Sequence, residues 1–467
     1  MVPGYKDDSY MIIQPGSQHT LVTFGLQDPL EVPSHSIATV VYQNQEDKSF
    51  SLQDSAESKP IYPIVQGEIV DNEAFMFFIH STVTSVINDR NNALTEPGEN
   101  EDGTPSTRVT EEFGLEHVNL LLVQTSGQWN PLYVESIVTY AFETMNIHSI
   151  SIIPLELCAS FSFGSLANAL VIDLGYEKTE ITPMIDYQVF SPGKKIVKKG
   201  GNSINKVLSK LLPHLTESQI EELKKSHIFE CLSEEDAKNS FFGMEGLIEN
   251  LEDKNKEDDG VLDIAAIVTS DKPTREILED SKKNKKHVET RPNSELETNT
   301  FVDSNGNEIT VGKERFQGCN DLIDSIVFNI YHALKKVPDL KKRQDCYDNI
   351  IICGQTSKIK GLKEKIIFHL FSNYVVISDN KLLQPQSQFR NDVRPIDDTS
   401  ILQVPRHLKL VPKVEYFSEW KKHGFENCSF LGAEILSKQV FNSSNEFSLS
   451  KEVFSEKGPS AIWESAL

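Results

Sequence analysis

Apolar positions follow two alternating patterns along the chain, and together they predict strands interleaved with helices. Short β-branched runs at residues 119–123 and 350–352 are typical of buried strands. Asn130 followed by Pro131 is typical of a helix start. The pattern indicates the α/β class, and 467 residues are enough for two lobes. Two more segments have apolar side chains at helical spacing: Phe75, Ile79, Val83 and Val86, and Ile323, Ile326, Ile330 and Leu334.

Three polar stretches interrupt this pattern and predict excursions from a compact fold. Residues 91–113 contain Pro and Gly and predict a loop. Residues 230–300 contain nineteen acidic and ten basic side chains, a composition typical of a partly disordered insertion. Within it, Lys282–Lys286 is compatible with a nuclear import signal and with a solvated run of charge. Residues 378–413, rich in Gln, Asn, Asp and Pro, form the third stretch.

Residues 12–20 and 171–179 repeat one arrangement of apolar, polar and glycine residues. In each, an apolar strand end precedes a polar residue, with a Gly two positions later and a Thr six positions later. A hairpin of this kind exposes backbone N–H groups that can bind phosphate oxygens. Taken alone, the two segments are also compatible with unrelated Gly turns. A buried strand that ends at Gly354, with a helix after Gly361, adds a third turn, and the three together are typical of a two-lobed nucleotide clamp.

Several motifs in the same order resemble those of the actin family. They are Tyr62–Gly67, Phe142–Thr144, Asn305–Phe316, Phe430–Ala433 and Lys457–Ser460. The resemblance implies an actin-like two-lobed fold, shared with Hsp70 chaperones and hexokinase and built from duplicated ribonuclease-H-like subdomains. The implied first lobe is residues 1–170 (subdomains 1 and 2), the second is residues 171–420 (subdomains 3 and 4), and residues 421–467 return to the first lobe.

Within the actin family, three further motifs are most similar to a fungal actin-related protein of chromatin remodellers. These are Arg315–Asn320, Glu419–Lys422 with Gly424, and Ile462 with Trp463. The similarity implies a structural subunit of SWI/SNF-type and RSC-type complexes in the nucleus. It also implies partners: actin-related protein 7, the helicase-SANT-associated helix of the remodeller's ATPase subunit on which the two proteins pair, and other remodeller subunits.

The nucleotide cleft that the resemblance implies has lost residues that would contact Mg²⁺ and phosphate. Gln14 stands in place of the family's Asp, so the carboxylate that helps to order the water shell of Mg²⁺ is missing. Leu21 stands in place of the phosphate-binding Lys, and Glu177 adds a negative charge where actin has Gly. Gly201 precedes a helix expected at residues 203–212. The degenerate cleft comprises Gln14, Gly16, Ser17, Asp173, Gly175, Thr179, Gly201, Gly354, Gln355 and Thr356.

The residues that position the attacking water in the family are missing as well. Pro154 aligns with the family's Gln, and Glu180 aligns with its His. Because phosphoryl transfer depends on positioning and charge stabilisation, we expect no ATPase activity and no cofactor. ATP binding without turnover is left open. The alternative function is a divergent actin-like nucleotide-binding protein or ATPase of the cytoskeleton, although residues 43–60, at the family's filament loop, are mostly polar.

The groove that receives partner helices in actins is expected to be apolar in this chain. The resemblance places it between a helix start at residues 160–164 and a helix at residues 435–441. An apolar groove beside an acidic surface suits a long basic amphipathic helix. The same side chains are also typical of residues that only pack the core. The implied groove residues are Phe163, Ile435, Leu436, Val440 and Phe441.

Composition narrows the classes of partner. The formal net charge of −23 repels phosphate backbones, so we expect no direct contact with nucleic acid. No apolar run approaches the roughly 18 residues of a membrane span, and no basic leader opens the sequence, so neither a membrane segment nor a signal peptide is expected. The Cys residues lie far apart and the His residues are scattered, which predicts reduced thiols and no metal site.

Overall fold

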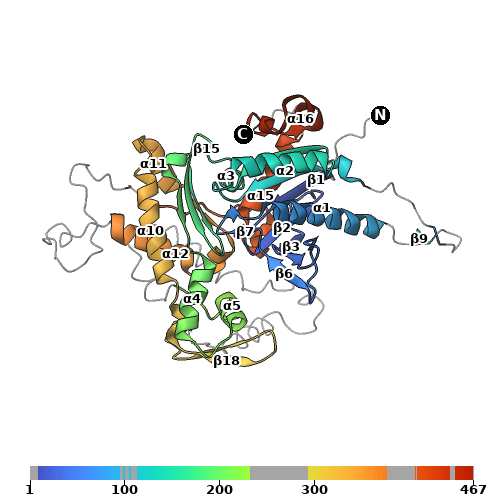
Figure 1. Cartoon of the computed structure of the whole chain (residues 1–467). Coiled ribbons are helices and arrows are strands. Elements are labelled where there is room, and N and C mark those ends of the chain that lie inside the picture. Colours follow the sequence, from blue (N-terminus) through green and yellow to red (C-terminus); the bar gives the residue numbers. More distant parts are fainter. Residues whose placement is uncertain are drawn as a thin grey trace, which may run out of the picture. The chain divides into compact units, whose positions relative to one another are not determined.

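The computed structural model describes residues 9–94, 98–99, 105–106, 113–231, 293–375, 405, 407–441 and 447–465 (Figure 1). Contacts divide the chain into two compact units. The α/β class predicted from the apolar pattern is confirmed, whereas the division into lobes at residues 170 and 420 stays a prediction. Unit 1 comprises Met1–Ser203, Asp324–Lys358 and Gln386–Leu467, and unit 2 comprises Ile204–Ile323 and Ile359–Pro385.

The first sheet of unit 1 has the strand order β20-β12-β11-β1-β2-β3. Strands β1, β11 and β12 are parallel, and the other strands join them in antiparallel pairs. Ile13 of β1 lies opposite Leu122 of β11 on one side and Val22 of β2 on the other. The strands are β1 (Tyr10–Gln14), β2 (His19–Phe24), β3 (His35–Ala38), β11 (Asn119–Gln124), β12 (Ser149–Pro154) and β20 (Leu449–Ser450).

The second sheet, also in unit 1, repeats this topology. Its order is β15-β14-β13-β19, and β16 pairs with β14 as well. Strand β13 is antiparallel to β14 and parallel to β19, as β1 is antiparallel to β2 and parallel to β11. The repeat agrees with the duplicated subdomains implied by the sequence. The strands are β13 (Ala169–Leu174), β14 (Thr179–Ile185), β15 (Gln188–Val189), β16 (Lys195–Val197) and β19 (Ile350–Cys353).

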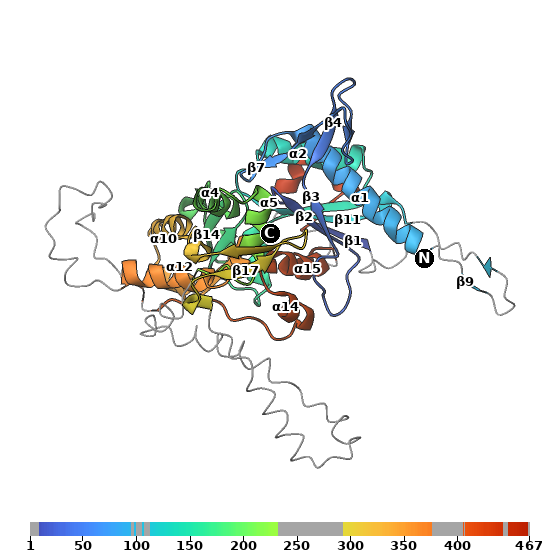
Figure 2. The ribbon, with the colours of Figure 1, turned by 90° about the horizontal axis from the view of Figure 1, so that it is seen from below.

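Helices cover the sheets of unit 1. Asn130 caps the start of α2, where its Oδ1 accepts a hydrogen bond from the Leu132 backbone N–H at 3.0 Å, as the Asn-Pro signal predicted. The helices predicted from apolar spacing are confirmed as α1 and α10. Figure 2 shows α14 close to α15, and both contribute to one core. The helices are α1 (Asn72–Leu94), α2 (Pro131–Glu143), α3 (Leu155–Phe161), α11 (Leu340–Asp348), α14 (Ser418–His423), α15 (Cys428–Val440) and α16 (Lys451–Lys457), while α4 (Gly201–Leu211) and α10 (Asn320–Leu334) cross the unit boundary.

Side chains of the first sheet alternate between two apolar cores, because successive strand residues point to opposite faces. Met11 and Ile13 pack in the core that α1 and α2 cover. Tyr10 and Ile12 pack in the other core, with α3, α15 and residues of the second sheet such as Val171. Burial on both faces explains why these strands are continuous apolar runs in the sequence.

Unit 2 contains α5 (Glu217–Lys225), the hairpin of β17 (Asn299–Val302) with β18 (Glu308–Val311), and α12 (Leu362–Leu370). The fully buried Arg315 donates hydrogen bonds to the carbonyls of Asn293 and Leu296 at 2.7 and 2.5 Å. The side-chain amide of Asn293 donates to the Ile228 carbonyl at 2.8 Å. Arg315 and Asn293 therefore fasten together the two described ends of the acidic insertion.

The predicted polar stretches lie mostly outside the described residues, including 232–292 with Lys282–Lys286, and 376–404. At their described ends they are more ordered than predicted. Helix α1 continues to Leu94, so the predicted loop at 91–113 begins as helix. Backbone hydrogen bonds from residues 409–411 to Tyr347 and Ile350 attach the end of the third stretch to β19.

Short elements complete the fold: β4 (Val41–Asn44), β5 (Phe50–Ser51), β6 (Ser58–Ile61), β7 (Ile64–Val65), β8 (Glu68–Ile69), β9 (Gly98–Glu99), β10 (Pro105–Ser106), η2 (Leu115–His117), η3 (Ser191–Gly193), η4 (Asn293–Glu295), η5 (Lys313–Phe316), η6 (Gln355–Lys358), η7 (Phe371–Val375) and η8 (Pro459–Trp463).

Candidate functional site

The predicted hairpins are present as β1–β2 and β13–β14, and the predicted third turn follows β19 at Gly354. The backbone amides of their glycines are already engaged within the chain. The Gly16 amide donates to the His19 carbonyl at 3.1 Å, and the Gly175 amide donates to the Lys178 carbonyl at 2.9 Å. The Gly354 amide donates to the Glu426 carbonyl at 2.7 Å. These amides therefore have partners without any ligand.

The first hairpin carries neutral side chains where it approaches its neighbours. Gln14 is half-buried, and its Oε1 accepts a hydrogen bond from the Ser429 hydroxyl at 3.1 Å. Leu21, opposite Gln14 in the register, packs against the core of α3 and α15. The Thr125 hydroxyl donates to the Pro15 carbonyl at 2.7 Å, which ties the turn before Ser17 to the end of β11. This hairpin has lost its charged chemistry by substitution.

The second hairpin keeps Asp173, and a lysine of the same hairpin compensates its charge. Asp173 lies opposite Glu180 in the β13–β14 register, and Lys178 forms ion pairs with both. The Lys178 ammonium donates to Glu180 Oε2 at 2.6 Å, to the Thr125 carbonyl at 2.9 Å and to Asp173 Oδ2 at 3.4 Å. Only 9% of the Lys178 side chain is exposed. Three oxygen atoms thus satisfy the three N–H donors of a buried ammonium.

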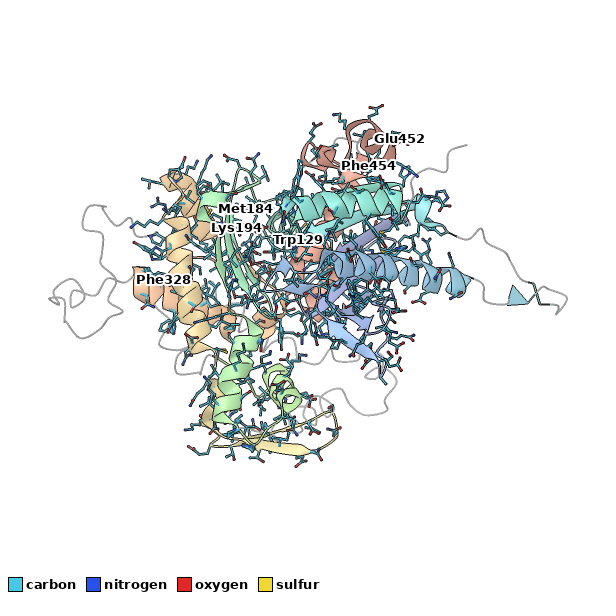
Figure 3. All side chains as sticks on the ribbon, in the orientation of Figure 1. Trp129, Met184, Lys194, Phe328, Glu452 and Phe454 are labelled. Carbon is cyan, nitrogen blue, oxygen red and sulfur yellow. The ribbon has the colours of Figure 1, made fainter. Side chains whose placement is uncertain are left out.

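A second lysine, Lys194, is partly buried and extends this network to helix α3. Lys194 Nζ lies 3.0 Å from Glu180 Oε1 and 3.0 Å from Glu156 Oε1. The Thr182 hydroxyl donates to Glu156 at 2.9 Å, and the Gly127 amide donates to Glu180 Oε1 at 3.1 Å. Figure 3 shows Lys194 at the second sheet, immediately before β16. Each carboxylate of this network is therefore paired with a cation or a hydrogen-bond donor.

The network shifts the pKa values of its members. Burial would raise the pKa of Glu180, but Lys178 and Lys194 outweigh burial and lower that pKa to about 2. Burial would lower the pKa of Lys178, but Glu180 and Asp173 outweigh it and raise that pKa. The pKa of Asp173 is raised by burial, because its 3.4 Å separation from Lys178 is longer than the Glu180 contact. Glu180 is therefore the principal counter-ion of Lys178.

Pro154 and Glu180 stand where the actin family has the Gln and His that position the attacking water. Glu180 is part of this network, and Pro154 lies beside it. Pro154 ends β12 and precedes the first residue of α3, where it lines a cavity of about 190 Å³ together with Gln124, Glu156 and Lys194. Glu180 faces Lys194 from β14. Pro154 therefore lines the same cavity as Lys194, and Glu180 forms an ion pair with it. Glu156, the carboxylate among the residues that line this cavity, is paired with Lys194 and is therefore a poor base for activating water.

Other cleft residues also bind parts of the same chain. The Thr179 hydroxyl donates to the Lys199 carbonyl at 2.8 Å, and the Thr356 hydroxyl donates to the Gly175 carbonyl at 2.9 Å. Glu177, expected to oppose a polyphosphate, accepts a hydrogen bond from the backbone N–H of Gln66 at 2.7 Å. The side chain of Gln355 is exposed and donates to Asn427 Oδ1 at 2.9 Å.

Glycine is required at two of these turns. Gly354 has φ of +87°, and an added Cβ would lie 2.4 Å from the Leu174 carbonyl oxygen. The predicted helix at 203–212 begins earlier, at Gly201, whose amide donates to the Gly175 carbonyl at 3.0 Å. Gly200 allows this approach, since its Cβ would lie 2.4 Å from the same carbonyl.

The residues of the implied groove do not all face a surface. Leu436 and Val440 are fully buried in the core, so they cannot line an open groove. Phe163, Ile435 and Phe441 are only partly buried and pack on that core. The chain at residues 160–164 is the end of helix α3 and the turn after it, with φ of +88° at Gly164, and not a helix start. Helix α15 starts at Cys428, before the predicted Ile435.

Lys178, Lys194 and Glu156 were not predicted from the sequence. A usable signal existed for Lys178: it lies two residues before Glu180, just ahead of β14, and so short a separation in sequence favours an ion pair between their opposite charges. Asp173 opposite Glu180 in a buried hairpin also demanded a cation. Lys194 and Glu156 come from separate segments, and their meeting depends on how α3 packs on the second sheet.

These residues do not fit the Mg²⁺–nucleotide group that an actin-like cleft implies. The retained Asp173 is already paired with Lys178, and the glycine amides that could bind phosphate donate within the chain. Glu177 adds a further carboxylate, which would repel a polyphosphate. Among the residues with described positions, no group of three His, Cys, Asp or Glu side chains could hold a metal ion.

The fold and this cleft define an actin-type protein, and comparison with known proteins supports the same class. The model of the Actin family matches residues 6–464, so the chain belongs to the actin family. It is similar to the SWI/SNF and RSC complexes subunit arp9 of Schizosaccharomyces pombe, with 25% identity over 554 residues that cover 99% of each chain. The similarity to fungal actin-related protein 9 read from the sequence is thereby confirmed. In the described part of the chain, no helix has the length and apolarity needed to cross a membrane.

Proposed function

We propose that this protein is a non-catalytic actin-related subunit of a nuclear chromatin-remodelling complex of the SWI/SNF or RSC type. Similarity to arp9 along 99% of both chains supports membership of the complex. The observation that carries the non-catalytic role is the Lys178–Glu180 ion pair at 2.6 Å. It places a cation against the retained acid of the cleft and removes Glu180 as a base.

The absence of catalysis is tested by ATP hydrolysis of the purified full chain with Mg²⁺. We expect a rate no higher than that of a heat-denatured control, because phosphoryl transfer needs positioned water and charge stabilisation that this cleft does not offer. Asp173→Ala serves as the matched variant. Magnesium-dependent turnover that disappears in Asp173→Ala would refute the non-catalytic role and favour a divergent actin-like ATPase.

The proposed partners are actin-related protein 7 and a long basic helix of the remodeller's ATPase subunit, together with other remodeller subunits. The net charge of −23 supports attraction of a basic helix, and it disfavours direct contact with nucleic acid. The partly exposed Phe163, Ile435 and Phe441, at the ends of α3 and along α15, supply apolar anchors of the kind that bind amphipathic helices. Leu436 and Val440 are left out of the proposed surface because they are buried.

Co-expression with actin-related protein 7 and the ATPase-subunit helix tests this surface. We expect the wild type to co-elute with both partners in size exclusion, and Phe163→Glu and Ile435→Glu to weaken binding at least about tenfold, as loss of an apolar anchor does. Leu132→Glu is the matched control, since Leu132 is 68% exposed on α2. Circular dichroism verifies that all variants fold. Equal co-elution of folded Phe163→Glu and Ile435→Glu would show that the helix binds elsewhere; failure of the wild type to join would reject the complex itself.

A further inference from the structure

The Lys178 ammonium connects segments that are far apart in the sequence. It contacts β13 through Asp173, β14 through Glu180 and the end of β11 through the Thr125 carbonyl. Thr125 in turn holds the turn of the first hairpin through the Pro15 carbonyl. One buried cation thus joins both hairpins of the cleft to the strand that lies beside the first.

The methylene chain of Lys178 packs against Gly67. It passes so close to Gly67 that a Cβ there would lie 2.6 Å from Lys178 Cδ, and the φ of +85° at Gly67 suits glycine. Gly67 belongs to the motif at residues 62–67 that the sequence shares with actins. The position of the lysine is therefore built from several segments and is not a chance surface pairing.

The atoms around the ammonium are of the kind that bind a divalent cation. Two carboxylate oxygens and one backbone carbonyl converge on Lys178 Nζ at 2.6 to 3.4 Å. Carboxylate and carbonyl oxygens are the ligands that Mg²⁺ and Ca²⁺ prefer. Buried carboxylates without a partner are strongly destabilising, so some positive charge is required at this position.

We propose that the Lys178 ammonium is an internal replacement for a divalent cation, which holds the two hairpins together and makes the fold of unit 1 independent of metal and nucleotide. The raised pKa of Lys178 keeps it charged across the physiological range. The proposal depends on the proposed function only in sharing its cleft, and its test reads stability, whereas the tests above read hydrolysis and complex formation.

The first measurement is thermal unfolding of the full chain for Lys178→Met, Glu180→Gln and the double variant. Lys178→Met keeps the length of the side chain and leaves Glu180 and Asp173 with less compensation. We expect it to lower Tm by about 5 °C or more, because loss of one partner of a buried pair is costly. The double variant should regain part of that loss. Lys198→Met is the matched control, since Lys198 is 58% exposed and lies 3.7 Å from Glu68; its Tm should stay within about 1 °C.

The second measurement uses Mg²⁺ and Ca²⁺ alone as probes. We expect millimolar metal to raise the Tm of Lys178→Ala by about 2 °C or more through binding to the vacated oxygen atoms, and to leave the wild type and Lys198→Ala unchanged. If Lys178→Ala does not fold, Lys178→Met and the double variant decide the matter. A Lys178→Met protein as stable as the wild type, strictly additive Tm losses in the double variant, or equal metal effects on wild type and Lys178→Ala would each overturn the proposal.

Discussion

The two hairpins of the cleft share one topology and have lost the same chemistry by different routes. In the hairpin of β1 and β2, neutral Gln14 and Leu21 stand where the actin pattern has charges, and they form a hydrogen bond and an apolar contact. In the hairpin of β13 and β14, Asp173 remains, and Lys178 with Glu180 surrounds it with charge. Substitution removed the charges from the first hairpin, whereas the second kept its acid and added a counter-ion.

The comparison shows that a retained family residue need not retain its role. Asp173, Gly175 and Thr179 match the family pattern, yet each is engaged with Lys178, Lys199 or Gly201 of the same chain. The buried ion pairs of the second hairpin should be more sensitive to substitution than the neutral contacts of the first, since an unpaired buried charge is costlier than a lost neutral hydrogen bond.

Glu180→Gln should have the largest effect among substitutions that test this contrast. It removes the charge between Lys178 and Lys194, so we expect the free energy of unfolding to fall by about 3 kcal/mol. Urea denaturation of the full chain measures this. Glu177→Gln is the matched control on the same hairpin: it weakens one hydrogen bond to the Gln66 amide, and we expect about 1 kcal/mol. Equal losses in the two variants would mean that the buried ion pairs of Glu180 stabilise the fold no more than a single hydrogen bond does.

The effect of Glu180 should depend on pH. Its folded-state pKa of about 2 lies below the ordinary value of 4.5, so its stabilisation is fully present above about pH 4.5 and is lost as the pH falls toward 2. We expect the difference in unfolding free energy between wild type and Glu180→Gln to be constant from pH 6 to 8 and to shrink below about pH 4.5. Asp173, whose pKa is raised, acts in the opposite sense in both proteins. A difference that stays constant down to pH 3 would contradict the assignment.

Gln14→Ala should have a smaller effect, because the first hairpin depends on neutral contacts. It removes the hydrogen bond from Ser429 at 3.1 Å, and we expect a loss of about 1 kcal/mol. Ser429→Ala should cost a similar amount, and the double variant should lose little more than either single variant, because both remove one bond. A loss as large as that of Glu180→Gln would erase the contrast between the hairpins.

Replacement of residues 232–292 by a short Gly/Ser linker should cause the smallest loss of stability of these changes, because no loss is expected. The two ends are already joined, because Asn293 is hydrogen-bonded to Ile228 and Arg315, and the Glu230 backbone N–H donates to the Arg315 carbonyl. Shortening a loop also changes closure entropy slowly. We expect the free energy of unfolding to change by no more than about 2 kcal/mol, without a loss. Arg315→Ala is the contrasting variant, which should destabilise strongly because Arg315 is fully buried. Unfolding of the shortened chain would show that the insertion contributes to the core.

The glycine spacing and apolar runs were sufficient to predict both hairpins, the Gly354 turn and the main helices. They could not predict the groove, because the burial of Leu436 and Val440 depends on how α3 and α15 approach each other. At Gly432 an added Cβ would lie 1.7 Å from the Cys158 carbonyl oxygen, and the helices therefore meet closely. Gly432, Leu436 and Val440 share one face of α15, so that contact turns all three toward the core. Such an approach is a property of packing and leaves no periodic signal in either segment.

Equilibrium dialysis of the purified full chain against labelled ATP with Mg²⁺ tests the central claim most directly. The claim is that Lys178 and Lys194 compensate the carboxylates of the cleft, and that its glycine amides already donate hydrogen bonds within the chain. It predicts no saturable binding up to about 1 mM ATP. Saturable, magnesium-dependent binding in the wild type that is abolished in Asp173→Ala would contradict it, because Asp173 would then be available to the metal and not to Lys178.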